Sequence, residues 1–267
     1  MNLHENVNNY NIAIYKSIIM KFIGIIPSRY ASTRFPGKPL VNIKGKTMIR
    51  RVYEQTAKII DTVVVATDDK RIENEVKKFG GNVVMTSTNH KSGTDRCAEA
   101  IDKFQELKNK NFDVVINIQG DEPFIDPEQI KKIISCFDDD KTQIATLIKP
   151  INNYEDIFNP NKPKVLINKN KQAIYFSRSP IPFVRNFDKN LWVDKHQFYN
   201  HIGLYAYRYD VLKEITKLEQ SPLEIAESLE QLRWIENDYK IRVEITENES
   251  ISIDTPEDLE KIKDRFK

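Results

Sequence analysis

The chain has 267 residues, 40% of them hydrophobic and 30% charged, a composition expected of a soluble globular protein with a sizeable core. Its 41 basic and 39 acidic residues nearly cancel, and no basic stripe follows the first loop, so a nucleic-acid partner is not expected. No apolar run reaches the roughly 18 residues that a membrane span needs, so no membrane partner is expected either.

Residues 1–19 differ in character from the rest of the chain. They read MNLHENVNNYNIAIYKSII, rich in Asn and without the basic start and long apolar centre of a secretory signal. Met20 stands directly before the first strong strand pattern. We expect residues 20–267 to form a single domain, and either residues 1–19 are a loose, flexible extension or Met20 is the functional start.

Strand and helix patterns alternate over the first 150 residues. Short apolar, β-branched runs predict strands, and apolar positions three and four apart predict helices. The strands are expected within 22–26, 62–67, 82–86, 112–118 and 142–151, and helices over 47–60, 70–80 and 127–137. A further helix is expected after the loop 87–96, with Ala98, Ile101 and Phe104 on one side. Such alternation is typical of an α/β fold with a mainly parallel central sheet, which binds ligands at the carboxyl ends of its strands. Cys97 and Cys136 fall within helical patterns and lack metal-type spacing, so we expect buried free thiols in a reducing compartment.

The pattern changes after Pro163. Two runs, KVLIN and QAIYFSRS, flank NKNK and predict a hairpin. We expect further strands at HIGLYAYR, KIRVEITE and SISID, one helix over 221–239 that opens with a capping box, and a last helix capped by Thr255. No linker separates this part from the first, so it is an antiparallel addition to the same domain.

The first loop, IPSRYASTRFPGKPL, is unusually basic for the exit of a buried strand. Arg29, Arg34 and Lys38 are spaced five and four residues apart, with Ser32 and Gly37 between them. Cations, hydroxyls and backbone donors around a glycine suit a polyphosphate. Neither the dinucleotide-binding nor the P-loop glycine pattern is present, and a solvated basic loop is the plainer alternative.

Two carboxylates are candidates for a metal. Asp121, in QGDEP, follows an apolar strand at the edge where the basic loop is expected, which suits Mg²⁺ shared with phosphate oxygens. A helix cap is the alternative, but Asp126 is better placed for that. Asp254 precedes the last helix, and since Thr255 can cap that helix alone, Asp254 is either a second metal ligand or an ordinary helix starter.

Other polar residues are weak signals one by one. The segment SGTDR, from Ser92 to Arg96, could seat a nucleobase edge or simply begin a helix. A histidine or tyrosine on a strand is most often core or rim, and acidic residues on a helix are most often solvated.

In combination these segments resemble one family. In chain order they are IPSRYASTRFPGKPL, HKSGTDR, INIQGDEP, FNPNKPKVL, IYFSRSPIPF, HIGLYAYR, SPLEIAESLEQLRWIE and IDTPEDLEKI. They closely resemble the 3-deoxy-manno-octulosonate cytidylyltransferase (CMP-Kdo synthetase) family from about Phe22 to Phe266. The first loop and QGDEP also occur in other sugar-nucleotide pyrophosphorylases, whereas HIGLY and LEQLR point to the Kdo branch.

The resemblance implies a Rossmann-like nucleotidyltransferase fold, usually a homodimer that pairs through the antiparallel part. It implies transfer of CMP from CTP to 3-deoxy-manno-octulosonate (Kdo), with Mg²⁺, in the cytoplasm and for lipopolysaccharide assembly. The metal would be held by Asp121 and Asp254, and Arg34, Lys38 and Asp121 would be catalytic. The nucleotide would contact Arg29, Ser32, Arg34, Lys38, Ser92, Gly93 and Arg96, and the sugar acid Gln119, Arg178, His201, Tyr205, Glu230 and Gln231.

One departure and three alternatives stay open. Ser87 stands where some relatives carry an arginine near the nucleotide, so base recognition is the least secure of these transfers. Another acidic sugar, such as 8-amino-Kdo or a sialic acid, would fit the same shape. A metal-dependent glycosyltransferase would be expected to show a DxD-type motif, which QGDEP is not. An inactive nucleotide-binding module would be expected to lack Arg34, Lys38 or Asp121.

Overall fold

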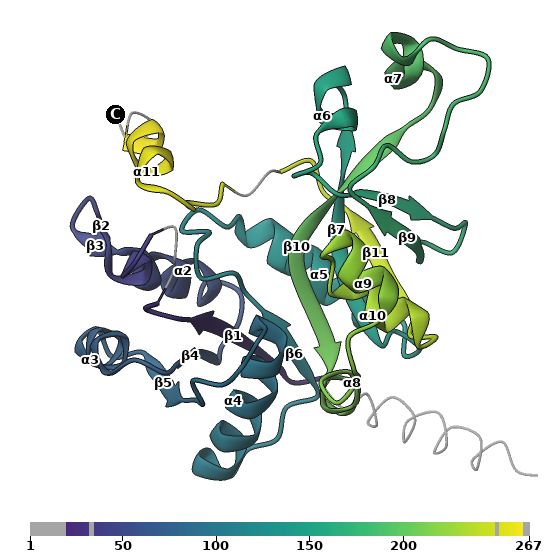
Figure 1. The fold of residues 1–267 in the computed structure, drawn as a ribbon. Coiled ribbons are helices and arrows are strands. Elements are labelled where there is room, and N and C mark those ends of the chain that lie inside the picture. The colour runs from purple at the N-terminus through teal and green to yellow at the C-terminus, as the bar shows by residue number, and fades with distance from the viewer. Residues whose placement is uncertain (1–19, 32–34, 249–250, 264–267) are drawn as a thin grey trace, which may run out of the picture.

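A computed structural model describes residues 20–31, 35–248 and 251–263 (Figure 1). The predictions that fall on residues 1–19 lie outside this range. A nine-stranded sheet forms the centre of the molecule, with the path β11-β7-β10-β6-β1-β4-β5 and the hairpin β8–β9 attached to β10. The strands are β1 (Phe22–Ser28), β4 (Val63–Thr67), β5 (Asn82–Met85), β6 (Val114–Asn117), β7 (Ile144–Ile151), β8 (Lys164–Ile167), β9 (Ala173–Ser177), β10 (Phe198–Arg208) and β11 (Ile241–Ile245).

The sheet is mainly parallel, as predicted. Strand β1 pairs in parallel with β4 and β6, β4 with β5, and β11 with β7. Strand β10 runs antiparallel to both β6 and β7, with Tyr205 opposite Asn117. Because β10 runs the other way, its first residues extend past the carboxyl end of β6. His201 and Tyr205 therefore reach the edge where the loops of the parallel strands emerge.

Some of the helices cover the two faces of the sheet, and others lie away from it. The helices are α2 (Met48–Thr56), α3 (Lys70–Lys78), α4 (Gly93–Lys108), α5 (Pro127–Ser135), α6 (Tyr154–Phe158), α7 (Trp192–Lys195), α8 (Tyr209–Ile215), α9 (Pro222–Glu227), α10 (Gln231–Glu236) and α11 (Pro256–Lys263). Several of them begin at side-chain caps: the side chains of Asp69, Ser92, Asp126 and Ser221 each accept a backbone N–H of the helix that follows. The capping box predicted at Ser221 is confirmed. Among the described residues, no helix has the length and apolar character to cross a membrane.

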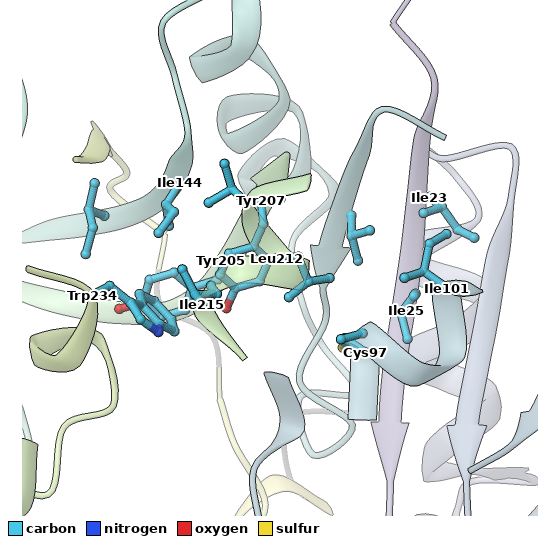
Figure 2. Close-up of a cluster of buried hydrophobic side chains, with 14 of the residues drawn as sticks. Ile23, Ile25, Cys97, Ile101, Ile144, Tyr205, Tyr207, Leu212, Ile215 and Trp234 are labelled. Atoms are coloured by element: carbon cyan, nitrogen blue, oxygen red, sulfur yellow. The ribbon is translucent and has the colours of Figure 1, made fainter. Parts of the chain in front are cut away.

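Two hydrophobic cores lie on opposite faces of the sheet, because side chains alternate along each strand. From β1, Ile23 and Ile25 enter one core together with α4, α8 and α10. Figure 2 shows this core with Cys97, Ile101 and Trp234 packed around the strands. The neighbouring Ile26 faces the other core, which is closed by α2, α3 and α5.

Both cysteines are buried free thiols, as predicted. Cys97 lies in the first core and Cys136 in the second. Burial raises the pKa of the Cys97 thiol far above its usual range, and it raises the pKa of Cys136 to about 12. Both groups are therefore inert at neutral pH.

Three expectations about the second half were wrong or incomplete. The helix predicted over 221–239 is broken into α9 and α10 at Ser228, whose φ of 51° is left-handed. The side chain of Arg178 lies at this break, where its Nε donates to Glu227 O and its Nη2 to Ser228 O, carbonyls that would accept backbone amides in a continuous helix. The short helices α6, α7 and α8 were not predicted, since each is too brief to show a clear helical period.

The predicted strand SISID is also wrong for its described residues. Residues 251–254 form no strand, and the amide of Ile253 donates instead to Asp121 O at 2.9 Å. The side chain of Ile253 packs with Ile43 and Met48 in a small core of its own. This route carries the chain from β11 across the molecule to α11 (Figure 1), and it brings Asp254 to the carboxyl end of β6.

Candidate active site

A polar cavity of about 420 Å³ opens at the carboxyl edge of the parallel strands. It is formed by the exit of β1, the loop after β6, and the segment before α11. Its lining residues are Pro27, Ser28, Arg29, Ala31, Lys38, Pro39, Gln119, Gly120, Asp121 and Asp254. The basic loop and QGDEP therefore meet, as the order of strands predicted.

Lys38 is bound by both candidate metal ligands. Its Nζ donates to Asp121 Oδ2 at 2.8 Å and to Asp254 Oδ1 at 3.1 Å. The lysine side chain is only 13% exposed, while the two carboxylates are 28% and 33% exposed and face the cavity. Two carboxylates thus share one ammonium, and Arg29 lines the same cavity.

The donor set suits Mg²⁺. Two carboxylates from distant parts of the chain lie around one point, and both border the cavity. The described residues hold no group of three or more His, Cys, Asp or Glu side chains that could hold a metal by themselves. A hard cation here would therefore complete its oxygen ligands from water or from the phosphates of a substrate, as Mg²⁺ usually does.

The glycine of QGDEP allows the two loops to approach closely. A Cβ on Gly120 would lie 2.9 Å from Pro27 O and 3.0 Å from Ser28 Oγ, so no side chain fits there. Ser28 Oγ is buried and has no hydrogen-bond partner in the described part of the chain. A buried hydroxyl without a partner at a cavity wall is a group that a ligand can satisfy. Sequence reasoning missed Ser28, and its only signal was its place directly before Arg29.

The predicted nucleotide residues are distributed over two places. Arg29 is exposed and lines the polar cavity with Lys38, whereas Ser32 and Arg34 lie outside the described residues. Ser92 is the N-cap of α4 and forms a capping box, so it has a structural role at the start of this helix. Gly93 lies beside β1, because a Cβ on it would be 3.4 Å from Pro27 Cγ.

Arg96 is buried on the protein side of α4. Its Nη1 donates to Thr86 Oγ1 at 2.5 Å and its Nη2 to Asp68 Oδ2 at 2.7 Å, and its side chain is 1% exposed. These bonds join the first turn of α4 to the ends of β4 and β5. The nucleotide contact of Arg96 stays a prediction, and the structure places the residue as a tie between elements.

Replacing Arg96 by Met is expected to lower the free energy of unfolding by about 3 kcal/mol, because it leaves Asp68 and Thr86 without their cation. Urea denaturation followed by circular dichroism measures this change. Lys131→Met is the control, since the Lys131–Glu128 pair is on the surface and is worth less than about 1 kcal/mol. Equal unfolding midpoints for the two variants would contradict the role assigned to Arg96.

The predicted sugar residues surround the start of β10 and the break between α9 and α10. Gln119 lines the polar cavity, and its Nε2 donates to Gly203 O at 3.0 Å. His201 contacts Thr146 Oγ1 through Nε2 at 3.1 Å, and burial lowers its pKa to about 3, so the ring is neutral. The ring of Tyr205 packs edge-on against Trp234 at 5.1 Å between centroids.

Glu230 and Gln231 lie at the break itself. Glu230 Oε2 accepts a hydrogen bond from Thr94 Oγ1 at 2.9 Å, and burial raises the pKa of this carboxyl. Gln231 is 4% exposed, and its Nε2 has no partner among the described residues. Arg178 donates to backbone carbonyls on either side of the break, so it fixes the turn that presents these two residues.

A second cavity, of about 970 Å³, is lined by the loop before α4 and its first turn, by the segment after α8, and by α9 and α10. Ser92 and Glu230 are on its wall, with His90, Lys91 and Arg233. Ser92, predicted to contact the nucleotide, and Glu230, predicted to contact the sugar, therefore border this second cavity. The polar cavity that Lys38 lines contains neither residue.

Comparison with known proteins defines the class. The family model described as Cytidylyltransferase matches residues 23–245, so the chain belongs to the cytidylyltransferase family. Within it, the 3-deoxy-manno-octulosonate cytidylyltransferase of Parabacteroides distasonis is 64% identical over 247 residues, covering 91% of this chain and 97% of the relative. The enzyme of that name from Bacteroides thetaiotaomicron is 61% identical over 251 residues, covering 93% and 99%. These relatives confirm the resemblance to the CMP-Kdo synthetases.

Solved structures agree with this placement. The structure of CMP:2-keto-3-deoxy-manno-octonic acid synthetase complexed with CTP superposes with a TM-score of 0.84 at 41% identity, covering 92% of this chain and 98% of that one. A cytidylyltransferase from Leptospira borgpetersenii superposes with a TM-score of 0.57 at 19% identity and covers 91% of this chain, which shows the shared fold.

Proposed function

We propose that the chain transfers CMP from CTP to Kdo and releases pyrophosphate. The observation that carries this proposal is the Lys38–Asp121–Asp254 cluster. It joins segments 83 and 216 residues apart in sequence at the carboxyl edge of a cytidylyltransferase sheet. The names of the relatives and the CTP bound to the structural neighbour support CTP and Kdo as the substrates.

The reaction needs no covalent intermediate with the enzyme. The anomeric hydroxyl of Kdo attacks the α-phosphorus of CTP, and the bond to the pyrophosphate oxygen breaks in line with the attack. Such transfers depend on positioning and on charge neutralisation. Lys38, with Arg29 and Arg34 of the same loop, would neutralise the leaving pyrophosphate, and Ser28 Oγ would donate to a phosphate oxygen at the cavity wall.

Asp121 and Asp254 would hold Mg²⁺. When bound there, the metal would supply positive charge to the phosphate oxygens and would lower the pKa of a hydroxyl bound to it. The protein's part is to hold the two carboxylates in place, which it does through the bond from Ile253 N to Asp121 O and the bond from Asp254 N to Asp258 Oδ2.

The sugar acid would occupy the region between β10 and the break after α9. Three guanidinium nitrogens of Arg178 donate to protein carbonyls, which leaves other N–H groups for the sugar carboxylate. The Nε2 of Gln231, which no described residue binds, and the neutral ring of His201 would bond hydroxyl groups. Another acidic sugar is the alternative, and the names of the relatives favour Kdo over it.

We also propose a homodimer that works in the cytoplasm and supplies CMP-Kdo for lipopolysaccharide. The exposed apolar side chains of Ile174 and Phe183, 53% and 74% exposed, support pairing through the antiparallel part. In Figure 1, the β8–β9 hairpin and α7 extend outward from the central sheet, where a second copy could reach them.

Mass spectrometry of the product tests the proposed reaction. Purified protein with Mg²⁺, CTP and Kdo is expected to form a species with the mass of CMP-Kdo, and 3-deoxy sugars without the carboxylate are not expected to react. A product that contained two or three phosphates, or none that contained the sugar, would overturn the proposed transfer.

Arg178→Ala is expected to raise KM for Kdo by about tenfold or more and to change KM for CTP less, because a lost charged hydrogen bond is worth about 1.5–3 kcal/mol. Initial rates at varied concentrations of each substrate measure both constants. If KM for CTP moved and KM for Kdo did not, the assignment of the two ends of the site would be reversed.

A further inference from the structure

Lys164, the first residue of β8, has a fully buried side chain. Its side chain is 0% exposed, although lysine is almost never fully buried unless it is paired. Its Nζ donates to Asn159 O and to Arg178 O, each at 2.8 Å. Burial lowers its pKa to about 8, so at neutral pH the ammonium form still predominates and holds these carbonyls. The proposed reaction uses no atom of this residue.

Glu227, the last residue of α9, binds the backbone amide of the same residue, Arg178. Its Oε2 accepts from Arg178 N at 2.9 Å, and its Oε1 accepts from Ser177 Oγ at 2.6 Å. Lys164 and Glu227 thus bind the carbonyl and the amide of one residue, Arg178. The backbone at the end of β9 is therefore held from two elements, by Lys164 of β8 and by Glu227 of α9.

The side chain of Arg178 binds the backbone at the end of α9. Its Nε donates to Glu227 O at 2.6 Å and its Nη2 to Ser228 O at 3.2 Å, at the point where α9 ends and the chain turns through a left-handed residue. Its Nη1 donates to Pro160 O at 2.9 Å. We name the three charged residues Lys164, Arg178 and Glu227 the hairpin clamp. They join the end of β9 to the turn after α9 through bonds from each segment to the other.

The turn leads directly to the proposed sugar residues. Glu230 follows Glu227 by three residues and Gln231 by four. Beyond the turn, Glu230 Oε2 is held by Thr94 of α4. The segment is thus anchored at one end by the hairpin clamp and at the other by α4, and a change at the clamp would displace both side chains together.

We propose that Lys164 and Glu227 are positioning residues that set affinity for the sugar acid without touching it. The inference rests on the proposed function, because it takes Glu230, Gln231 and Arg178 as sugar contacts. The polar cavity with Lys38, Asp121 and Asp254 contains neither residue. Loss of the clamp should therefore weaken the sugar half of the site and spare the nucleotide half.

The test compares Glu227→Gln and Lys164→Met in the full chain. Gln keeps the size of Glu227 but offers one acceptor oxygen where the carboxylate offers two. For either variant we expect KM for Kdo to rise about tenfold or more while KM for CTP stays within about twofold, since only a subset of substrate contacts is lost. Glu227→Asp and Lys164→Arg, which keep the charges, should recover part of the Kdo affinity.

The matched controls are Lys171→Met and Glu244→Gln. Lys171 is at the tip of the same hairpin and forms an ion pair with Glu244 of β11, and the two side chains are 49% and 27% exposed. Both controls should leave the two KM values unchanged. Glu227→Gln keeps the inference testable if Lys164→Met fails to fold, which thermal denaturation would reveal.

The outcomes separate the two proposals. If wild-type protein forms no CMP-Kdo, the proposed function fails whatever the variants do. If wild-type protein is active and the folded clamp variants keep their KM for Kdo, or raise KM for CTP equally, the positioning role is overturned and the clamp serves stability alone.

Discussion

Replacing Asp121 by Asn is expected to lower turnover with CTP and Kdo at least ~10²-fold while the protein remains folded. Asn has nearly the same shape, but it removes one of the two negative charges that face the polar cavity beside Lys38. Loss of one well-placed electrostatic group typically costs about 10²- to 10³-fold in rate. Steady-state release of pyrophosphate at saturating substrates measures the effect, and thermal denaturation checks the fold.

A control variant lies in the same loop. Asp126 caps α5 by accepting from Glu128 N, and Asn is an equally good helix cap. Asp126→Asn should therefore keep near-normal turnover. If Asp121→Asn were as active as Asp126→Asn, Asp121 would have to be removed from the metal site and from the mechanism.

Lys38→Met should have two separable effects. Turnover should fall at least ~10²-fold, because the leaving pyrophosphate loses its buried ammonium. In addition, the protein without nucleotide should bind Mn²⁺, a spectroscopic substitute for Mg²⁺, more tightly than wild type. In the structure the ammonium is shared by Asp121 and Asp254, so it competes with any second cation for the same oxygens.

Electron paramagnetic resonance of Mn²⁺ measures the second effect without catalysis. We expect an increase in affinity of about tenfold, the scale of one relieved charge contact. Lys46→Met is the control, since Lys46 pairs with Glu54 on the surface. Unchanged or weaker binding of Mn²⁺ by Lys38→Met would show that the lysine and the metal do not share a site.

Much of the fold could be predicted because its signals are local. The β-branched run that forms β4 is buried at every position, and only a strand covered on both faces suits such a run. Asp69 and Asp126 begin helices because a side-chain oxygen close in sequence satisfies the first amides. Where the outcome depended on distant residues the prediction failed, as at Ser228, where Arg178 from another element takes the helix carbonyls.

In the site, too, the features set by local sequence could be predicted and those set by distant residues could not. The loops after β1 and β6 were expected to meet because parallel strands end at one edge, and they do. The partners of Lys38 could not be derived from spacing, since Asp254 reaches it through a segment expected to be a strand. Lys164 and Glu227 gave no signal either, because a buried lysine and an exposed one look the same in a sequence.

Pyrophosphate release by the purified protein with Mg²⁺, CTP and Kdo tests whether the protein catalyses the proposed transfer. Parallel reactions replace CTP with UTP, or Kdo with a sialic acid. We expect release that requires Kdo and is strongest with CTP. Release only with a different acidic sugar would contradict the sugar assignments, and no release with any pair would contradict catalysis itself and favour a nucleotide-binding module.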